Sequence, residues 1–271
     1  MSTDTTPTFW RDAELPFIEA RRIEDGRQVH YGRHSHEFFS MGAVTSGQST
    51  YLHERSRQTI SAGTVVLMNP GEVHACNPIE DQPWSYVMLY VDADWLAGIQ
   101  HSHDDGVGMG FQPIAATHTQ SPELFAGLID FYAQLIDPTV DALPKHEAAV
   151  AFFMLMQRAL GNSTLELKKI NPRVVRAAEY INEHFKGAVR LEAMCKAANL
   201  SEAYLIRAFE QQYHMTPHAY LINRRIQHAQ TQLRYGASII DIAHEAGFAD
   251  QAHFQRVFKK HLAATPRQYK P

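Results

Sequence analysis

The chain has 271 residues, and its 25 Lys and Arg against 29 Asp and Glu give a formal net charge of −4 at pH 7. This length suits two domains, and two cysteines, Cys76 and Cys195, are too few for a disulfide framework. The sequence shows no apolar run of about 18 residues, no signal-peptide pattern, no phosphate-binding Gly-rich loop and no nucleophile elbow. We therefore expect a cytoplasmic protein with reduced thiols that is neither an enzyme nor a membrane protein and that carries no cofactor.

The charges are distributed unevenly along the chain. Residues 1–165 carry a net charge of −11, whereas residues 166–271 carry a net charge of +7. A basic segment attracts the phosphates of nucleic acid, and an acidic segment is repelled by them. The charge alone fits a merely soluble module equally well, so the function of the basic part has to come from its motifs.

Short strand-like runs separated by turn residues fill the first hundred residues. The runs cover residues 38–44, 49–53, 64–68 and 85–91, and turn signals rich in Gly, Ser, Asn and Pro lie between them. Runs of this length and spacing predict a small antiparallel barrel or sandwich.

Histidines gather in two stretches of this region, His34-Ser35-His36-Glu37 and Gly71-Glu72-Val73-His74. On an extended segment, His34 and His36 point to the same side. Over about residues 20–95 the pattern resembles the two signature stretches of the cupin barrel, in the version fused to AraC-type regulators as an effector-sensing domain. The resemblance implies a small-molecule pocket, and the residues expected to line it are His34, His36, Tyr51, His53 and His74.

Two other roles for these histidines stay open. They could form a metal site of the His/carboxylate kind, or they could be ordinary structural histidines. Enzymatic cupins place the carboxylate several residues after the second histidine, whereas Glu37 directly follows His36 and points to the opposite face. We expect no metal ion.

Two helical stretches, residues 123–136 and 145–160, follow the predicted barrel. The second is very apolar through residues 150–155, and a helix with two apolar faces needs a second surface to bury one of them. We expect a homodimer in which the first stretch contributes Leu124, Leu128, Phe131 and Leu135. The alternative is that both faces pack on the barrel.

A pattern of seven residues near the C-terminus is repeated with an offset of 49 positions. Ser201, Leu205, Arg207, Phe209, Thr216, Pro217 and Tyr220 recur as Asp250, Phe254, Arg256, Phe258, Thr265, Pro266 and Tyr269. One fixed offset over seven positions indicates a duplicated supersecondary unit. Each copy reads as a short helix, a tight turn and a second helix, which is the unit that inserts a helix into DNA.

Cap residues and apolar periodicity predict where the helices of both units begin and end. We expect helices at residues 191–198 and 201–213 in the first unit and at 239–246 and 250–261 in the second, with Ser201 and Asp250 as N-caps. Between them, Thr216-Pro217 opens a connecting helix that ends near Tyr235 and is about 28 Å long at 1.5 Å per residue. Successive major-groove faces on one side of B-DNA lie about 34 Å apart, so the connecting helix could hold the two reading helices one turn apart.

The last hundred residues resemble the AraC/XylS class of bacterial transcription regulators. The resemblance is carried by Ser201-x-x-Tyr204-Leu205-x-Arg207-x-Phe209, by residues 242–248 and 253–259, and by Thr265-Pro266-x-x-Tyr269. It implies that the outward residues of the two reading helices contact DNA, namely Ser201, Ala203, Ile206, Arg207, Gln251, His253, Gln255 and Arg256.

The expected readers differ in chemistry between the two helices. Arginine pairs with guanine and glutamine with adenine through two hydrogen bonds. Ala203 and Ile206 can offer only apolar contact, which leaves Arg207 nearly alone as the polar reader of the first helix. For Arg207 and Arg256 the alternative role is a salt bridge to the scaffold.

These features predict an α+β multidomain protein. We expect a cupin-like antiparallel β-barrel over residues 1–105, a helical dimerisation segment with a linker over residues 106–165, and an all-α double helix-turn-helix domain over residues 166–271. The predicted function is regulation of transcription, more often activation, by a homodimer that binds double-stranded promoter DNA and a small-molecule effector. RNA polymerase is a further candidate partner.

Two alternative functions stay open. One is an architectural or ligand-independent DNA binder with a degenerate barrel. The other is a metal-dependent cupin enzyme with a DNA-binding tail, which near-stoichiometric iron or manganese in the purified protein would favour.

Overall fold

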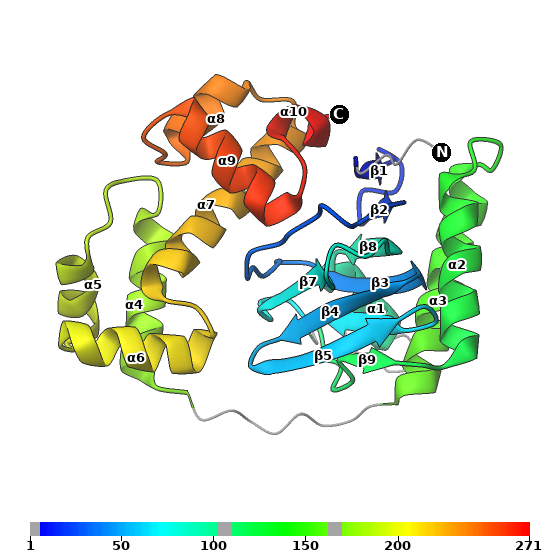
Figure 1. Ribbon diagram of the computed structural model, residues 1–271, viewed down its shortest axis with the longest axis horizontal. Helices are drawn as coiled ribbons and strands as arrows, with labels where there is room; N and C mark the ends of the chain where they lie inside the picture. Colours follow the sequence, from blue (N-terminus) through cyan, green and yellow to red (C-terminus); the bar gives the residue numbers. More distant parts are fainter. Residues whose placement is uncertain (1–5, 102–109, 162–169) are drawn as a thin grey trace. The chain divides into compact units, whose positions relative to one another are not determined.

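The computed structural model describes residues 6–101, 110–161 and 170–271 (Figure 1). The chain forms two compact units. The first comprises Met1–Val29, His36–Glu72 and Cys76–Glu166, and the second comprises His30–Ser35, Val73–Ala75 and Leu167–Pro271. Helices α2 and α3 therefore belong to the same unit as most of the strands.

The described strands form two sheets. The larger has the order β1-β2-β8-β3-β6-β9 and the smaller the order β5-β4-β7. Their bounds are β1 Thr8–Trp10, β2 Ile18–Ile23, β3 Phe39–Ser46, β4 Gln48–His53, β5 Ser56–Ser61, β6 Val65–Met68, β7 His74–Pro78, β8 Ser85–Val91 and β9 His118–Thr119. The neighbours β1–β2, β2–β8, β8–β3, β3–β6, β6–β9 and β4–β5 all pair antiparallel. The predicted antiparallel β domain is confirmed, with its strands in two sheets rather than in one closed barrel.

The four predicted runs correspond to β3, β4, β6 and β8. The turn between β3 and β4 depends on Gly47, whose φ of +69° lies in the left-handed region. A Cβ at this position would lie 2.2 Å from the carbonyl oxygen of Pro83. Both the backbone conformation and the close approach therefore require glycine.

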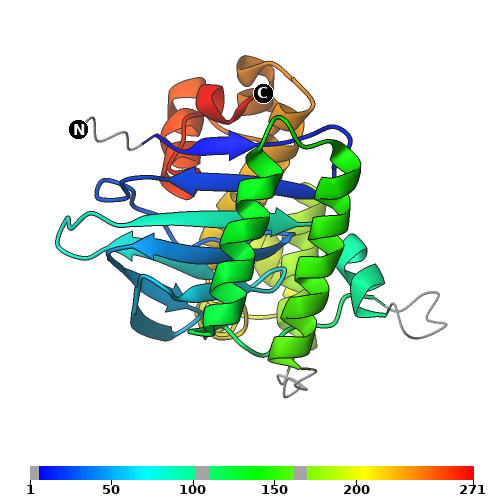
Figure 2. The same ribbon diagram turned by 90° about the vertical axis from the view of Figure 1, so that its right-hand side faces the viewer.

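Three helices belong to the same unit as the large sheet: α1 (Ala93–Gln100), α2 (Pro122–Ile136) and α3 (Ala142–Leu160). Figure 2 shows α2 and α3 side by side across the strands. One face of the sheet supplies Ala20, Met41, Leu67 and Leu89 to the core that these helices complete. The intervening residues of β2, β3, β6 and β8 point to the opposite face, because side chains alternate along a strand.

The expected dimerisation residues belong to this core. Leu124, Leu128, Phe131 and Leu135 are between 0% and 3% exposed and pack with the sheet and with Phe153. The packing accounts for their periodicity within one chain, so these side chains cannot also contact a second copy. Any dimer surface on this segment lies on other faces of α2 and α3.

The second unit contains the expected all-α domain, which has seven helices in residues 170–271. The helices are α4 (Pro172–His184), α5 (Leu191–Ala198), α6 (Glu202–Tyr213), α7 (Pro217–Arg234), α8 (Ile239–Glu245), α9 (Gln251–Leu262) and α10 (Pro266–Tyr269). Figure 1 shows α7 running from the α4–α6 group to the α8–α10 group. The two predicted helix-turn-helix units, α5–α6 and α8–α9, are confirmed.

Helix ends in this unit follow the predicted signals with one difference. The side chains of Thr216 and Thr265 accept hydrogen bonds from the first turns of α7 and α10, and Asp250 accepts one from His253 N at 2.6 Å. Ser201 is the N-cap residue of α6, but its side chain makes no capping hydrogen bond.

Neither cysteine of the chain forms a disulfide, since Cys76 and Cys195 are both free. Within the described ranges, no helix combines the length and the apolar character that crossing a membrane requires.

Candidate DNA-binding helices and effector site

Two of the four predicted readers at the first reading helix, α6, are apolar. The inward residues Leu205 and Phe209 are fully buried, whereas Ser201, Ala203 and Ile206 are exposed. Arg207 is exposed as well, and its Nε donates a hydrogen bond to Ala203 O of the same helix at 3.2 Å. The guanidinium therefore lies along the helix, and the neighbouring Ala203 and Ile206 can make only apolar contacts.

The second reading helix, α9, presents more hydrogen-bonding groups. Phe254 and Phe258 are fully buried, and Gln251, Gln255 and Arg256 are exposed on the other face. Each glutamine offers a donor and an acceptor to a base edge, and the arginine offers a pair of donors.

His253, the fourth predicted reader of α9, is placed differently. Its side chain is only partly exposed, and its ring meets Phe248 edge-on with centroids 5.5 Å apart. This contact indicates that His253 supports the turn before α9.

An exposed aromatic residue of α6, Tyr204, was not among the predicted contacts. Tyr204 is 47% exposed, although it stands inside the quoted motif. It lines a polar cleft at the start of α4 and α6 together with Asn171, Arg173, Asn199, Leu200 and Ser201. The sequence did contain a signal for this residue. Leu205 and Phe209 already fill the buried positions of α6, so a tyrosine next to Leu205 has to lie on the exposed side of the helix.

In the first unit, the face of the large sheet that points away from α2 and α3 carries a row of polar side chains. Tyr90 of β8 pairs in register with Glu19 of β2 on one side and with Ser40 of β3 on the other. Cross-strand partners have Cβ atoms about 5 Å apart, so these three side chains are neighbours on one face. Glu19 is 6% exposed and Ser40 is 0% exposed.

The next row on this face adds a buried guanidinium. Arg21 lies two residues beyond Glu19 on β2 and is 3% exposed. Its guanidinium carbon is 5.3 Å from the ring centroid of Phe9, and it lies within hydrogen-bonding range of the Tyr90 hydroxyl. Arg11 Nε donates to Glu19 at 2.6 Å. Burial raises the pKa of Tyr90 and keeps its hydroxyl protonated.

The small sheet contributes side chains that approach the large sheet. Tyr51 of β4 is fully buried, and its hydroxyl donates to Leu67 O of β6 at 3.0 Å. Burial also raises the pKa of Tyr51. Burial raises the pKa of the Cys76 thiol of β7, the strand next to β4 in this sheet. A polar patch of Glu19, Arg21, Ser40 and Tyr90 thus lies in the interior of the domain, and none of the four was among the predicted pocket residues.

Ser40 is the least satisfied group of this polar patch. Among the described residues its Oγ has no hydrogen-bond partner, although the side chain is completely buried. An unsatisfied buried hydroxyl costs about 1–3 kcal/mol. A ligand that bonds to it would remove that cost.

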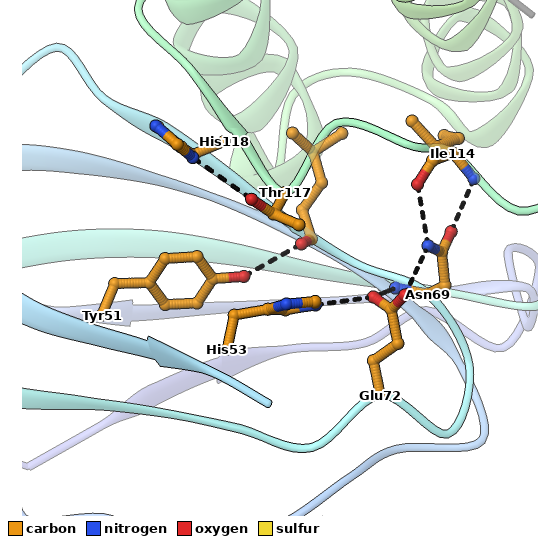
Figure 3. Close-up of polar contacts among 8 residues, drawn as sticks. Tyr51, His53, Asn69, Glu72, Ile114, Thr117 and His118 are labelled. Atoms are coloured by element: carbon orange, nitrogen blue, oxygen red, sulfur yellow. Dashed lines mark hydrogen bonds and ion pairs between the residues drawn. The ribbon is translucent and has the colours of Figure 1, made fainter. Parts of the chain in front are cut away.

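His53, one of the predicted pocket residues, is held by a hydrogen-bond hub (Figure 3). Glu72 accepts from His53 Nε2 at 2.9 Å, from Asn69 N at 2.9 Å and from Asn69 Nδ2 at 3.0 Å. Burial alone would raise the pKa of Glu72, but these hydrogen bonds outweigh it and hold that pKa below its usual value. The amide of Asn69 in turn pairs with both backbone groups of Ile114, each at 2.8 Å. The hub therefore joins the β6–β7 turn to the segment that leads to α2.

The remaining predicted pocket residues are His34, His36 and His74. His34 and His74 exchange two backbone hydrogen bonds, and their ring centroids are 4.6 Å apart. His36 meets Tyr90 edge-on, with centroids 5.1 Å apart, which places it beside the polar patch.

A metal site at these histidines stays an open alternative, because His36 belongs to the first unit and His34 and His74 belong to the second. The carboxylate of Glu72, two residues before His74 in sequence, is bonded to His53 and Asn69.

Two protein families match most of the chain. Residues 17–153 match the family described as AraC-like ligand binding domain, and residues 194–271 match the helix-turn-helix domain family. The first match spans half of the chain and includes the polar patch, the histidines and α2. The second includes both reading helices.

Similar proteins match over most of this chain and most of their own length. An uncharacterized HTH-type transcriptional regulator of Bacillus subtilis, YbfI, is 28% identical over 92% of this chain and 89% of its own length. The HTH-type transcriptional activator RhaS of Escherichia coli is 25% identical over 89% of this chain and 87% of its own.

Solved structures show the fold. The apo form of a ToxT variant from Vibrio cholerae superimposes with a TM-score of 0.58 at 12% identity, over 93% of this chain and 96% of that chain. Wild-type ToxT with a bound unsaturated fatty acid has a TM-score of 0.54 at 13% identity, over 99% and 96% of the two chains.

Proposed function

We propose that this chain, which belongs to the AraC family of transcriptional regulators, activates transcription when a compact polar effector binds inside its sheet domain. The family membership supplies DNA binding by the helix-turn-helix domain and ligand binding by the N-terminal domain. What we propose beyond the family membership is that the effector is compact and polar and that the regulation is activation. The relatives that match over nearly the whole chain are regulators of transcription and are not enzymes.

The polar patch carries the proposal for the effector. Val66, Met68 and Met88 are the apolar neighbours of the polar patch on this face of the sheet. The patch itself provides one guanidinium, one carboxylate and two hydroxyl groups. Binding sites use a few placed polar groups on an apolar wall to orient a small ligand. The mixture of donors and acceptors suits a molecule with several hydroxyl groups, such as a sugar or a hydroxy acid.

The predicted pocket residues fit this site as a supporting shell. His36 lies against Tyr90, and Tyr51 and His53 are bonded within the domain. We therefore assign His36 to the wall of the site, with Tyr51 and His53 holding its surroundings. His34 and His74 belong to the second unit and stay predicted pocket residues. The fatty acid seen in ToxT is a ligand of that protein. A long apolar chain offers no group that could hydrogen-bond to the buried Ser40 hydroxyl, and it would set apolar carbon against the buried polar side chains of Arg21 and Glu19.

The effector class can be tested by ligand-induced stabilisation. We expect sugars or hydroxy acids, and not long-chain fatty acids, to raise the melting temperature of the purified full chain. A ligand at 100 times its Kd adds about 2.7 kcal/mol to the free energy of unfolding. Ser40→Ala should weaken the binding of the stabilising ligand about tenfold, as expected for one lost hydrogen bond. Ser46→Ala, at an exposed position of the same strand, is the matched control.

Two outcomes would contradict this proposal. Stabilisation by fatty acids alone would place a different ligand class in the domain. No stabilisation by any class would favour the architectural DNA binder without an effector.

We further propose activation as a homodimer that contacts RNA polymerase at its promoters. The similar protein RhaS is a transcriptional activator, which supports activation for this chain. For the dimer, Ile136 and Leu143, at the adjoining ends of α2 and α3, are 38% and 68% exposed and are available to a second copy. Sedimentation of Leu143→Glu should show a larger monomer fraction than the wild type, and an unchanged fraction would exclude this surface.

A further inference from the structure

Arg225 lies in α7, the helix that connects the two helix-turn-helix units. Its Nε donates to Phe185 O and its Nη2 donates to Gly187 O, both at 2.8 Å. Phe185 is the C-cap residue of α4, and Gly187 follows it. The last carbonyl groups of a helix have no partners within the helix and carry partial negative charge. The guanidinium therefore caps the C-terminal end of α4.

The same guanidinium also reaches the turn of the second unit. Its central carbon lies 5.9 Å from the ring centroid of Phe248. Gly247 has a φ of +76°, and a Cβ there would lie 2.7 Å from Lys186 O and 2.9 Å from Arg225 Nη2. The α8–α9 turn thus packs directly on Arg225 and on the chain segment after α4.

Each contact is rigidly connected to one reading helix. Helix α4 shares the buried core of α5 and α6, including Ile181, Leu205 and Phe209. Phe248 packs against Phe254 of α9, with ring centroids 5.2 Å apart. One side chain therefore contacts the support of α6 and the support of α9 at once.

We infer that Arg225 is a positioning residue that sets the spacing and relative rotation of the two reading helices. Helix α7 has 18 residues, so it is about 27 Å long and separates the units along its axis. A connecting helix alone does not prevent either unit from turning about that axis. Arg225 links both units to α7 at one point, and the reading helices then meet the major groove about one DNA turn apart.

A phosphate contact does not explain this geometry. Two of the donor groups of Arg225 are bonded to backbone carbonyls, and its guanidinium carbon lies over the ring of Phe248. An arginine that binds DNA phosphate would direct this donor fork outward. Arginine also cannot be replaced here by lysine, because a single ammonium lacks the planar fork that bridges two carbonyls and stacks on a ring.

The test measures how strictly DNA binding depends on the distance between half-sites. It rests on the proposed tandem reading of DNA by α6 and α9. A preferred operator is first selected with the wild-type full chain. Affinity is then measured for that operator, for versions with the half-sites moved closer or farther by one and two base pairs, and for the α9 half-site alone.

We expect Arg225→Lys, which keeps the charge, to bind the single half-site as the wild type does. Its preference for the selected spacing over the shifted spacings should fall roughly tenfold, which is the fold-change expected for a lost hydrogen bond to a charged group. Phe248→Leu should flatten the spacing preference in the same direction. Arg224→Lys is the matched control, because Arg224 Nη1 donates to Gln227 of its own helix.

Several results would overturn the inference. An equal loss at every spacing and at the single half-site would mark Arg225 as a phosphate contact or as a residue needed only for folding. An unchanged spacing preference in folded Arg225→Lys and Phe248→Leu would remove its positioning role. A wild-type chain that prefers no sequence and no spacing would instead contradict the proposed function, and the inference with it.

Discussion

The two helix-turn-helix units are built on one scaffold but present different surfaces to DNA. Both reading helices bury a phenylalanine at the matched positions Phe209 and Phe258, and both end in a left-handed residue, His214 at φ +55° and Ala263 at φ +51°. These matched pairs are each 49 residues apart. The duplication therefore extends from the sequence to the backbone conformation.

The outward faces have diverged. Helix α9 is capped by the Asp250 side chain and exposes Gln251, Gln255 and Arg256. Helix α6 has no side-chain cap, and its arginine is bonded along its own helix. Packing restricts the inward residues of both copies, whereas the outward residues are free to change with the DNA sequence. We therefore expect α9 to carry the larger share of polar base readout and α6 to contribute less of it.

The largest expected effect tests the shared scaffold. Phe209→Ala and Phe258→Ala should each lower the free energy of unfolding by about 3–5 kcal/mol, because each removes a fully buried ring. Chemical denaturation of the full chain measures both. Gln255→Ala, at an exposed position, is the control and should change stability by less than about 0.5 kcal/mol. A lower free energy of unfolding in only one of the two variants would show that the two scaffolds are not equivalent.

The next effect tests the difference in readout. Arg256→Ala should cost about 1–3 kcal/mol of DNA affinity and relax the preference at one base pair. Arg207→Ala should cost less, because its guanidinium already donates to Ala203 O. Binding-site selection with wild type and both variants measures the base preference.

The same experiment separates base contact from phosphate contact. A uniform loss of affinity by Arg256→Ala, with a salt slope reduced by about one, would assign it to a phosphate. An equal or larger effect at Arg207 would reverse the proposed order of the two helices.

A smaller effect tests the helix caps. Asp250→Ala should lower the free energy of unfolding by about 0.5–2 kcal/mol, because it removes the hydrogen bond to His253 N. Ser201→Ala should have little effect, because the Ser201 side chain makes no capping hydrogen bond. Thermal denaturation compares the two, and equal losses would show that α6 is capped in solution as α9 is.

The smallest effect is a difference in acid sensitivity. Burial lowers the pKa of His261 near the end of α9, so the folded unit favours the neutral ring. An unfolded histidine titrates near pH 6.5, so this contribution to stability is present above about pH 6.5 and is lost as the pH falls. The matched position of the first unit is Gln212, which does not titrate.

The histidine variant isolates this contribution. His261→Gln should reduce the loss of stability between pH 7 and pH 5.5, measured by denaturation at each pH. His244→Gln, at an exposed position of the same unit, serves as the control. An unchanged pH dependence in His261→Gln would contradict a buried neutral ring.

The sequence by itself determined the architecture of the DNA-binding half. Its signals are local, since helix periodicity, caps such as Thr216 and Asp250, and the fixed repeat offset act within a few residues. The outward positions followed from the inward ones, because a helix with one buried face exposes the other. All predicted readers except His253 are exposed in the structure.

The sheet domain was less accessible to such reasoning. Strand β2 is buried on both faces. The polar residues Glu19 and Arg21 are therefore as buried as Ile18 and Ala20, and the alternation of polar and apolar residues does not mark an exposed face. Only the register of β2, β8 and β3 brings Glu19, Tyr90 and Ser40 together. The apolar stripe of α2 was visible in the sequence, but its partner was not, because a stripe specifies burial without specifying the surface that covers it.

Long-range contacts of single side chains also depended on the tertiary structure. Arg225 reaches carbonyl groups 40 and 38 positions earlier in the chain, and Asn69 reaches Ile114, 45 positions later. Every residue type supplies the same backbone carbonyl, so the sequence does not show which residues accept these hydrogen bonds. The sequence thus determined the helices and their repeat, where the causes are local. The tertiary structure decided the polar patch and the coupling of the two reading helices, because both depend on groups brought together only by folding.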